Sequence, residues 1–312
     1  MRLIDFTPDL KRAIVRTTGN LDSGSWFFID IPTLKATAIG YERDTILPSQ
    51  VGPISTVHYK AADGLALDGI LTLPPGREAK ALPVVMLPHG GPASFDRAEF
   101  DWWAQAFASR GYAVFQPNFR GSTNRDDAFR RAGHGEWGGK MQTDLSDGLA
   151  ALAAKGIVDP RRACIVGASY GGYAALAGVT LQSGLYRCAV AVAGVSDLND
   201  MYAEDYRGSG DAKISKVALL AELGPRDRWA ARSPRRNAAK ADAPILLIHG
   251  RDDTVVPYTH STRMADALRD AGKPVELVPL DGEDHWLSRA ATRRRMLEAS
   301  VAFVEKHNPP QP

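Results

Sequence analysis

The sequence has only two cysteines, Cys164 and Cys188, among its 312 residues. They form no Cys-x-x-Cys pair, and no group of cysteines and histidines has the spacing of zinc ligands. Because both lie in apolar runs typical of buried strands, we expect inert core thiols, and a core of this size does not need a structural disulfide. The sequence also lacks a phosphate-binding P-loop, so we expect no metal and no other cofactor.

Long hydrophobic runs and an excess of charge are also missing. No segment approaches the roughly 18 apolar residues of a membrane span, and residues 1–12 lack the hydrophobic stretch of a signal peptide. Lys and Arg number 38 against 36 Asp and Glu, a balance that gives no reason to expect a nucleic-acid partner. We therefore expect a soluble cytoplasmic protein with neither a membrane nor a nucleic-acid partner. If the chain is a fragment of a longer protein, a periplasmic location is the alternative.

The chain divides into two regions of different character. Residues 1–50 contain short β-like runs at 13–16, 26–31 and 35–39, separated by residues that favour turns. A proline-flanked linker at 47–53 follows them. The remaining residues, 51–312, begin with a predicted hairpin and are enough for one large domain.

In the second region compact apolar runs alternate with segments of helical length. The runs lie at 83–87, 112–115, 163–166, 189–193, 245–248 and 275–279, and the helical segments at 100–109, 141–155, 170–181, 259–271 and 289–305. Apolar runs without alternation suit strands that are buried on both faces, and their alternation with helices indicates a mostly parallel sheet. This pattern predicts the α/β-hydrolase fold. Residues 196–240 interrupt the pattern and are expected to form an inserted element.

The strongest local signal is Gly-Ala-Ser-Tyr-Gly at 167–171, between an apolar run and an alanine-rich helix. This Gly-x-Ser-x-Gly pattern is typical of a strand–turn–helix in which the serine hydroxyl is exposed at the apex of a very tight turn. Gly167 and Gly171 let neighbouring backbone pass closely, and the N–H groups that begin the helix favour developing negative charge. We therefore predict that Ser169 is a catalytic nucleophile.

A serine nucleophile needs a base, and seven histidines compete for that role. In an α/β hydrolase the serine, the acid and the histidine follow in that order, with the histidine on the loop after the last strand. His285 occupies such a loop, whereas His260 begins a helix and His307 lies in the C-terminal tail. We predict that His285 is the general base.

The acid of such a triad is expected after the strand at 245–248, where Asp252 and Asp253 share one loop. A carboxylate there would accept the histidine Nδ1–H and leave Nε2 to take the serine proton. From the residues alone either aspartate fits this role, and the other is then a loop-capping carboxylate.

Two backbone N–H groups are candidates for the oxyanion hole. His89-Gly90-Gly91-Pro92 follows the apolar run at 83–87, and its glycines bring the backbone close to a reacting carbonyl. We predict that the N–H groups of Gly91 and Tyr170 donate to the oxyanion.

The sequence says least about the substrate pocket. Four aromatic residues of the connecting segments are the candidates for its lining: Trp137, Tyr202, Tyr206 and Trp229. They line an apolar pocket beside Ser169 or form the core of the inserted element, two interpretations with equal support. The adjacent carboxylates of Glu204 and Asp205 are the only candidates that the sequence offers for binding a free amino terminus.

Five short motifs occur in order along the chain: HGGP at 89–92, FRGS at 119–122, GASYGGY at 167–173, IHGRDDTVVP at 248–257 and GEDHW at 282–286. Together they resemble the prolyl-oligopeptidase family of serine peptidases, and most of all its acylaminoacyl-peptidase and dipeptidyl-peptidase-like branch, from about residue 51 to 305. The resemblance implies Ser169 as nucleophile, Asp253 as acid, His285 as base, and oxyanion donors at Gly91 and Tyr170. It favours a small peptide or acyl-amino-acid substrate, with carboxylesterase action on small esters as the alternative.

The N-terminal region departs from that family, whose members precede the hydrolase with a complete β-propeller of several blades of roughly 40–45 residues each. Residues 1–50 resemble only one blade, so we expect a more open active site than is usual in the family. We expect this β-segment either to pack on the hydrolase or to form a homo-oligomer by pairing its edges with a neighbouring molecule.

Overall fold

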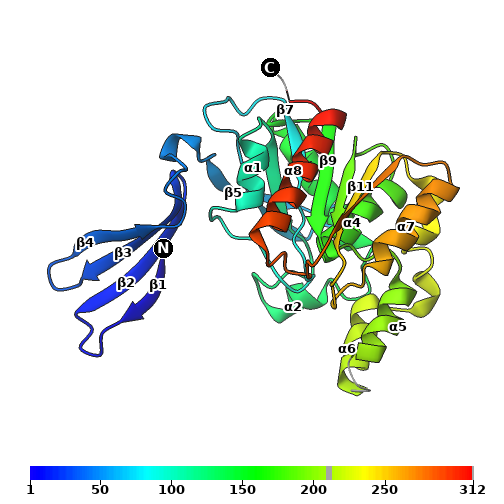
Figure 1. The fold of residues 1–312 in the computed structure, drawn as a ribbon, viewed down its shortest axis with the longest axis horizontal. Helices are drawn as coiled ribbons and strands as arrows, with labels where there is room; N and C mark the ends of the chain where they lie inside the picture. Colours follow the sequence, from blue (N-terminus) through cyan, green and yellow to red (C-terminus); the bar gives the residue numbers. More distant parts are fainter. Residues whose placement is uncertain (209–212, 311–312) are drawn as a thin grey trace.

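The computed structural model describes residues 1–208 and 213–310, and these residues form two β-sheets (Figure 1). The first sheet has the strand order β1-β2-β3-β4, and the second has the order β12-β11-β10-β9-β7-β8-β6-β5. The strands are β1 (Arg2–Phe6), β2 (Arg12–Gly19), β3 (Asp22–Asp30), β4 (Lys35–Tyr41), β5 (Ile54–Lys60), β6 (Ala66–Thr72), β7 (Leu82–Met86), β8 (Ala113–Asn118), β9 (Val158–Ala168), β10 (Ala189–Val192), β11 (Ile245–Gly250) and β12 (Val275–Leu280).

The helices are α1 (Trp102–Ala108), α2 (Asp127–Arg131), α3 (Lys140–Ala154), α4 (Tyr170–Thr180), α5 (Leu198–Gly208), α6 (Lys213–Leu223), α7 (Thr259–Asp270) and α8 (Ala290–His307), with short 3-10 helices η1 (Pro48–Gln50), η2 (Arg226–Arg228) and η3 (Pro234–Lys240). The five helical segments expected from the sequence are found as α1, α3, α4, α7 and α8.

The second sheet is parallel from β12 to β8, and β6 and β5 extend it antiparallel at one edge. Successive residues of a strand point to opposite faces, and both faces of this sheet are buried. In β9, for example, Ile165 belongs to the apolar cluster on one face and Val166 to the cluster on the other. This double burial explains the apolar runs without alternation, and it gives the chain the predicted α/β-hydrolase fold.

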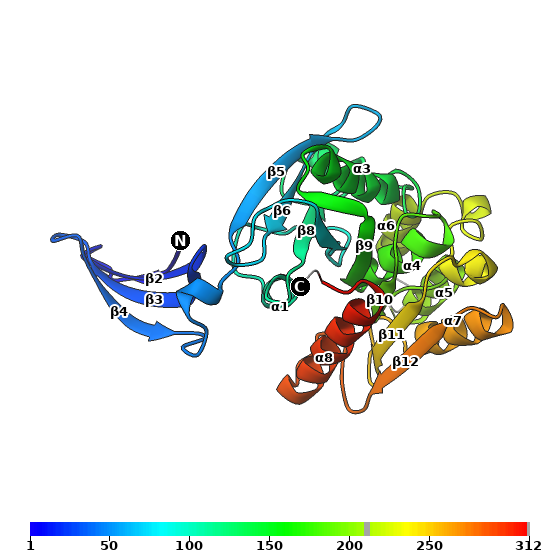
Figure 2. The same ribbon diagram turned by 90° about the horizontal axis from the view of Figure 1, so that it is seen from above.

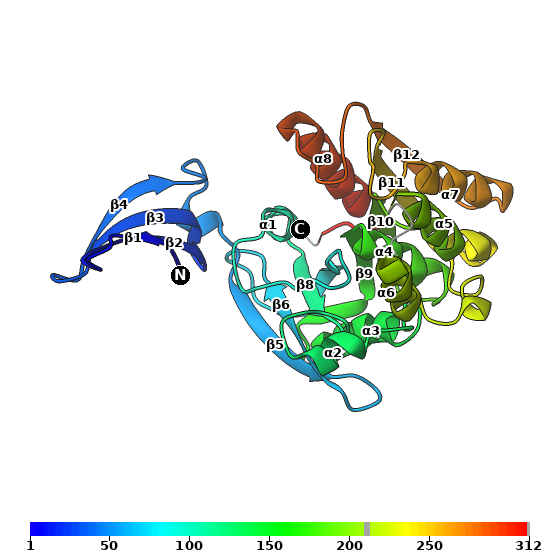
Figure 3. The ribbon, with the colours of Figure 1, turned by 90° about the horizontal axis from the view of Figure 1, so that it is seen from below.

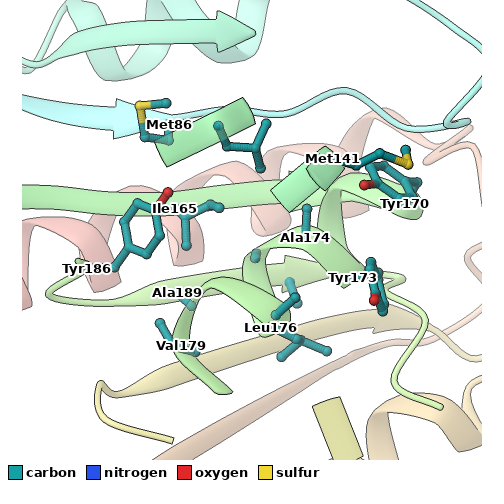
Figure 4. Packing of buried hydrophobic residues seen from close by; sticks show 14 of the residues in the cluster. Met86, Met141, Ile165, Tyr170, Tyr173, Ala174, Leu176, Val179, Tyr186 and Ala189 are labelled. Atoms are coloured by element: carbon teal, nitrogen blue, oxygen red, sulfur yellow. The ribbon is translucent and has the colours of Figure 1, made fainter. Parts of the chain in front are cut away.

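Helices cover the sheet on both faces, with α1 and α8 on one side and α3, α4 and α7 on the other (Figure 2). The buried residues agree: Phe107 and Val304 lie in one cluster, and Leu149 and Leu268 lie in the other. Figure 4 shows the second cluster around α4, whose small side chains let the helix lie close to the sheet. The turn between β9 and α4 is therefore fixed in the centre of the molecule.

The two cysteines correct a sequence prediction. Cys164 on β9 and Cys188, directly before β10, form a disulfide in the structure, so the prediction of free thiols is wrong. β9 and β10 are parallel neighbours in which Ile165 pairs with Ala189, so the two cysteines are adjacent across the strands. Their Cα atoms are 4.9 Å apart. The sequence could not give this proximity because it depends on the register of two strands that are separated by helix α4.

The four-stranded sheet of β1 to β4 stands beside the hydrolase body and joins it through the segment that contains η1 (Figures 1 and 3). Strands β2 to β4 were expected from the sequence. β1 was missed because this short strand at the sheet edge is exposed along its whole length. The sheet contacts the hydrolase at one end, where the Phe100 N–H donates to Thr18 Oγ1 at 3.0 Å. The likeness of this region to a propeller blade stays a prediction.

We predict that the purified chain self-associates through this sheet. Both of its edge strands, β1 and β4, present unpaired backbone groups, and large apolar side chains on them are exposed, among them Leu3 and Ile39. Light scattering after size exclusion should give a mass above the 33.7 kDa of one chain. Substituting Ile39→Lys on β4 should shift the protein toward the monomer. A monomer at every concentration tested would count against edge pairing.

Residues 196–240 form the inserted element that the sequence predicted, with α5 and α6 projecting from the body (Figure 1). Its 3-10 helix η3 packs against α4 and α7, which ties the element to the sheet. Within residues 1–208 and 213–310, no helix combines the length and the apolar character needed to cross a bilayer.

Candidate active site

Ser169 lies at the tight turn between β9 and α4 that the sequence predicted. Its backbone has φ 58° and ψ −119°, a left-handed conformation that is unfavourable for a residue with a side chain. The surrounding structure holds it there, because the Ser169 N–H donates to the Val192 carbonyl at 2.9 Å and the Ser169 carbonyl accepts from the Tyr173 N–H at 3.0 Å. Such a strained turn exposes the hydroxyl at the end of the strand, as a nucleophile requires.

The two glycines that flank Ser169 are needed for close packing. A Cβ at Gly167 would lie 2.4 Å from the Gly171 carbonyl oxygen, and a Cβ at Gly171 would lie 2.2 Å from the Pro88 carbonyl oxygen. No side chain fits at either position without moving the backbone. The expectation that these glycines allow a close backbone approach is confirmed.

Asp253 and His285 are in direct contact at the carboxyl end of the sheet. His285 Nδ1 lies 2.7 Å from Asp253 Oδ2, whereas Asp252 is exposed in the same loop. Burial by itself would raise the pKa of Asp253, but hydrogen bonds with the His249 and His285 rings and from the Val256 N–H hold it well below its usual value. An ionised carboxylate only accepts hydrogen bonds, so His285 donates from Nδ1 and its Nε2 is left to act as a base.

Backbone hydrogen bonds hold this carboxylate and the loop that contains His285 in place. Asp253 Oδ1 accepts from the Val255 and Val256 N–H groups, both at 2.8 Å. The Asp252 N–H donates to the Glu283 carbonyl at 3.0 Å, which ties the loop after β11 to the loop that contains His285. Sequence reasoning missed Glu283, which is fully buried and accepts from the Asp284 N–H at 3.0 Å. A charged residue two positions before His285 gave no sign in the sequence that it would be buried.

The hydrogen bonds of the described residues join His285 to Asp253 and not to Ser169. Catalytic hydrogen bonds often tighten only when substrate binds. Ser169 nevertheless borders the same cavity as Val255 and Val256, the residues that hold Asp253. The contact between the serine and the histidine stays a prediction.

The HGGP and FRGS motifs lie together beside Ser169. The His89 ring stacks on Phe119, with centroids 4.4 Å apart, and its Nε2 lies 2.9 Å from Ser122 Oγ. Burial lowers the pKa of His89 to about 4, so this ring is uncharged at neutral pH. A Cβ at Gly90 would lie 3.4 Å from Ser169 Cβ, which places the loop against the serine.

The predicted oxyanion donors, the N–H groups of Gly91 and Tyr170, lie beside Ser169. Gly91 and Tyr170 both line the cavity that Ser169 borders, Gly91 with a φ of 119°. The Tyr170 N–H is at the first residue of α4, where backbone N–H groups have no partner within the helix. Their role as donors to an oxyanion stays a prediction.

The cavity beside Ser169 has a volume of about 100 Å³. Its lining consists of Gly91, Trp137, Ser169, Tyr170, Val195, Met201, Glu204, Val255, Val256, Pro257 and His260. Of the four aromatic residues proposed for this lining, Trp137 contributes to it, with its ring 4.6 Å from that of Tyr170.

Tyr202 and Trp229 are not part of this lining, so of the two interpretations that the sequence left open, packing in the inserted element holds for them and pocket lining does not. Their rings pack on each other with centroids 5.3 Å apart. The indole N–H of Trp229 donates to the Gly224 carbonyl at 3.1 Å. They form part of the core of the inserted element because one turn of α5 directs Met201 and Glu204 toward the cavity and Tyr202 away from it. The side chains of Tyr206 and Asp205 lie outside the described residues.

Sequence reasoning missed most of the apolar wall. Val255, Val256 and Pro257 follow Asp253 closely in the motif after β11, with Thr254 between, so their position near the predicted acid was a usable signal. Val195, Met201 and His260 offered no such signal because they come from three separate segments of the chain.

A comparison of the sequence with known protein families agrees with this geometry. The model of the prolyl oligopeptidase family matches residues 98–309. The chain belongs to that family. Its match covers the segment from α1 to the end of α8, and so includes Ser169, Asp253 and His285.

Individual relatives in the family are much longer proteins. The chain is 31% identical over 258 residues to dipeptidyl aminopeptidase BIII of Pseudoxanthomonas mexicana, covering 80% of this chain and 37% of that protein. A puromycin-hydrolyzing peptidase of Mycobacterium tuberculosis superimposes with a TM-score of 0.86 at 28% identity, over 97% of this chain and 46% of that one. The acylaminoacyl peptidase of Pyrococcus horikoshii shares the fold, with a TM-score of 0.83 at 24% identity over 99% of this chain and 50% of that one. This chain therefore spans half or less of each.

Proposed function

We propose that this chain is a serine peptidase unit that cleaves amide bonds of small peptides or acyl-amino acids through an acyl-enzyme. The hydrogen bond between the buried Asp253 carboxylate and His285 Nδ1 is the observation that carries the proposal, because it prepares Nε2 as a base at the end of the sheet where the half-buried Ser169 lies. Family membership and the names of the dipeptidyl aminopeptidase and puromycin-hydrolyzing relatives support peptidase chemistry.

In the proposed mechanism the Ser169 hydroxyl attacks the carbonyl carbon of the substrate while His285 Nε2 takes its proton. The oxygen that becomes negative is stabilised by the N–H groups of Gly91 and Tyr170. His285 then gives the proton to the leaving amine, the carbon–nitrogen bond breaks, and an ester to Ser169 remains. Water, activated by His285, hydrolyses this ester and restores the serine.

The same groups hydrolyse esters, so substrate comparison tests the peptidase proposal against the carboxylesterase alternative. We expect p-nitroanilides of short peptides and of acetyl-amino acids to be turned over at rates well above background. Short p-nitrophenyl esters, whose leaving group is better, are expected to react as well. If the esters react and every anilide stays at background, the chain is an esterase and the peptidase proposal is wrong.

A further inference from the structure

The cavity beside Ser169 is lined mainly by apolar side chains and contains one carboxylate. Its walls come from aromatic and aliphatic side chains, among them Trp137, Tyr170 and Val195. Glu204 on α5 lies in the same lining, and its side chain is 16% exposed. Among the described residues of the lining, it is the one acidic side chain. A carboxylate placed in an apolar pocket is costly unless it is matched by hydrogen bonds or by a cation.

His260 holds Glu204 in this position but does not neutralise its charge. Glu204 Oε2 lies 2.8 Å from His260 Nε2, and the Ser196 N–H donates to His260 Nδ1 at 3.1 Å. Because Nδ1 accepts, the ring proton is on Nε2, which donates to Glu204. Burial lowers the pKa of His260, although Glu204 beside it acts in the opposite direction, so the ring is neutral at neutral pH.

The second oxygen of Glu204, Oε1, has an ion pair but no hydrogen bond with the part of the chain that the structure describes. Among the described residues, none donates a hydrogen bond to Oε1, and its nearest cation is the Arg263 guanidinium at 3.8 Å. That guanidinium is engaged by Asp200 at 2.8 Å and is about half exposed to solvent. A donor that enters the cavity would therefore find an acceptor to which none of the described side chains donates.

We propose that Glu204 makes this pocket select a substrate whose acyl-side residue has a side chain of lysine type, a methylene stem that ends in an ammonium group. The inference rests on the proposed function, which places the scissile carbonyl at Ser169. The stem would lie against the apolar walls, and the ammonium would meet Glu204 Oε1 and the faces of the aromatic rings. Glu204 Oε2 already accepts from His260, so Oε1 is the oxygen that remains, and a compact ammonium suits a single oxygen better than the planar fork of arginine does. A free amino terminus is attached directly to the backbone and has no stem for the apolar walls to cover.

The test compares lysine with norleucine, which has the same stem without the ammonium group. Acetyl-Lys and acetyl-norleucine are used both as p-nitroanilides and as thiobenzyl esters. For the native chain we expect kcat/KM to favour lysine by about tenfold or more, as for a charged hydrogen bond in a pocket. Glu204→Gln keeps an oxygen for His260 but removes the charge, and it should lower the lysine-to-norleucine ratio by about tenfold. Glu298→Gln on the exposed face of α8 is the matched control and should leave the ratio unchanged.

The following results would contradict either the pocket proposal or the peptidase function. Equal rates for lysine and norleucine in the native chain, or an unchanged ratio in Glu204→Gln, overturn the proposal. If Glu204→Gln instead slows norleucine substrates with a free amino terminus and spares acetylated ones, Glu204 binds the amino terminus, and the proposal is wrong. Thioester turnover with the expected ratio but no anilide turnover would refute the peptidase function while leaving the pocket inference standing. Covalent labelling of Glu204→Gln by a fluorophosphonate shows that the variant is folded.

Discussion

Replacing Ser169 with alanine is expected to lower kcat by about 10⁶-fold, which leaves only what the remaining binding and oxyanion groups supply. The reason is chemical: alanine has no oxygen to form the acyl-enzyme, and no neighbouring group occupies the same strained turn at the end of β9. The measurement is kcat on a p-nitrophenyl ester, together with labelling by a fluorophosphonate, which reacts only with an activated serine.

Ser183→Ala, at an exposed position just after α4, is the control for the Ser169 variant and should keep both activity and labelling. Alanine has the same Cβ as serine, so it should fit the backbone that holds residue 169 at φ 58°. The fold should therefore be preserved. If Ser169→Ala were still labelled at the native rate, the nucleophile would have to lie elsewhere in the chain.

Asp253→Asn should lower kcat by about 10⁴-fold, whereas Asp252→Asn should change it by no more than a few-fold. The asparagine Oδ1 can still accept from the Val255 and Val256 N–H groups, so the loop should keep its shape. The amide nitrogen, however, would face His285 as a donor. It would favour the tautomer with the proton on Nε2, and that ring cannot take the serine proton.

The two aspartates thus make a matched pair within one loop, since they differ in burial and in contact with His285. Kinetics on the same ester, with circular dichroism and a thermal melt for each variant, would separate a lost catalytic role from a lost fold. If Asp252→Asn were the more damaging change while both variants stayed folded, Asp253 would not be the acid of the triad.

Much of the candidate site could be predicted because its residues lie in short motifs at the ends of strands. The carboxyl ends of parallel strands meet at one edge of a sheet, so order and placement were enough to nominate Ser169, His285 and either Asp252 or Asp253. The family resemblance favoured Asp253 of the two. The common edge follows from the strand order in which β9, β10 and β11 are neighbours.

The pocket could not be predicted in the same way. Its lining comes from α4, α5, α7 and several loops, and sequence gives the spacing of residues along each segment but not the way one segment faces another. Tyr202 and Met201 are adjacent in sequence, yet Met201 lines the cavity and Tyr202 packs against Trp229. A rotation of α5 by one residue would exchange their environments.

By itself, the sequence determined the fold and the order of the chemical groups along it, because burial on both faces of a sheet and a tight strand–helix turn restrict which residues occur at neighbouring positions. Tertiary structure alone decided which aspartate meets His285, that Cys164 and Cys188 are joined, and that Glu204 lies in the cavity. Those three results depend on strand register, loop contacts and helix rotation. Each is a relation between segments far apart in the chain, set by packing rather than by the local sequence.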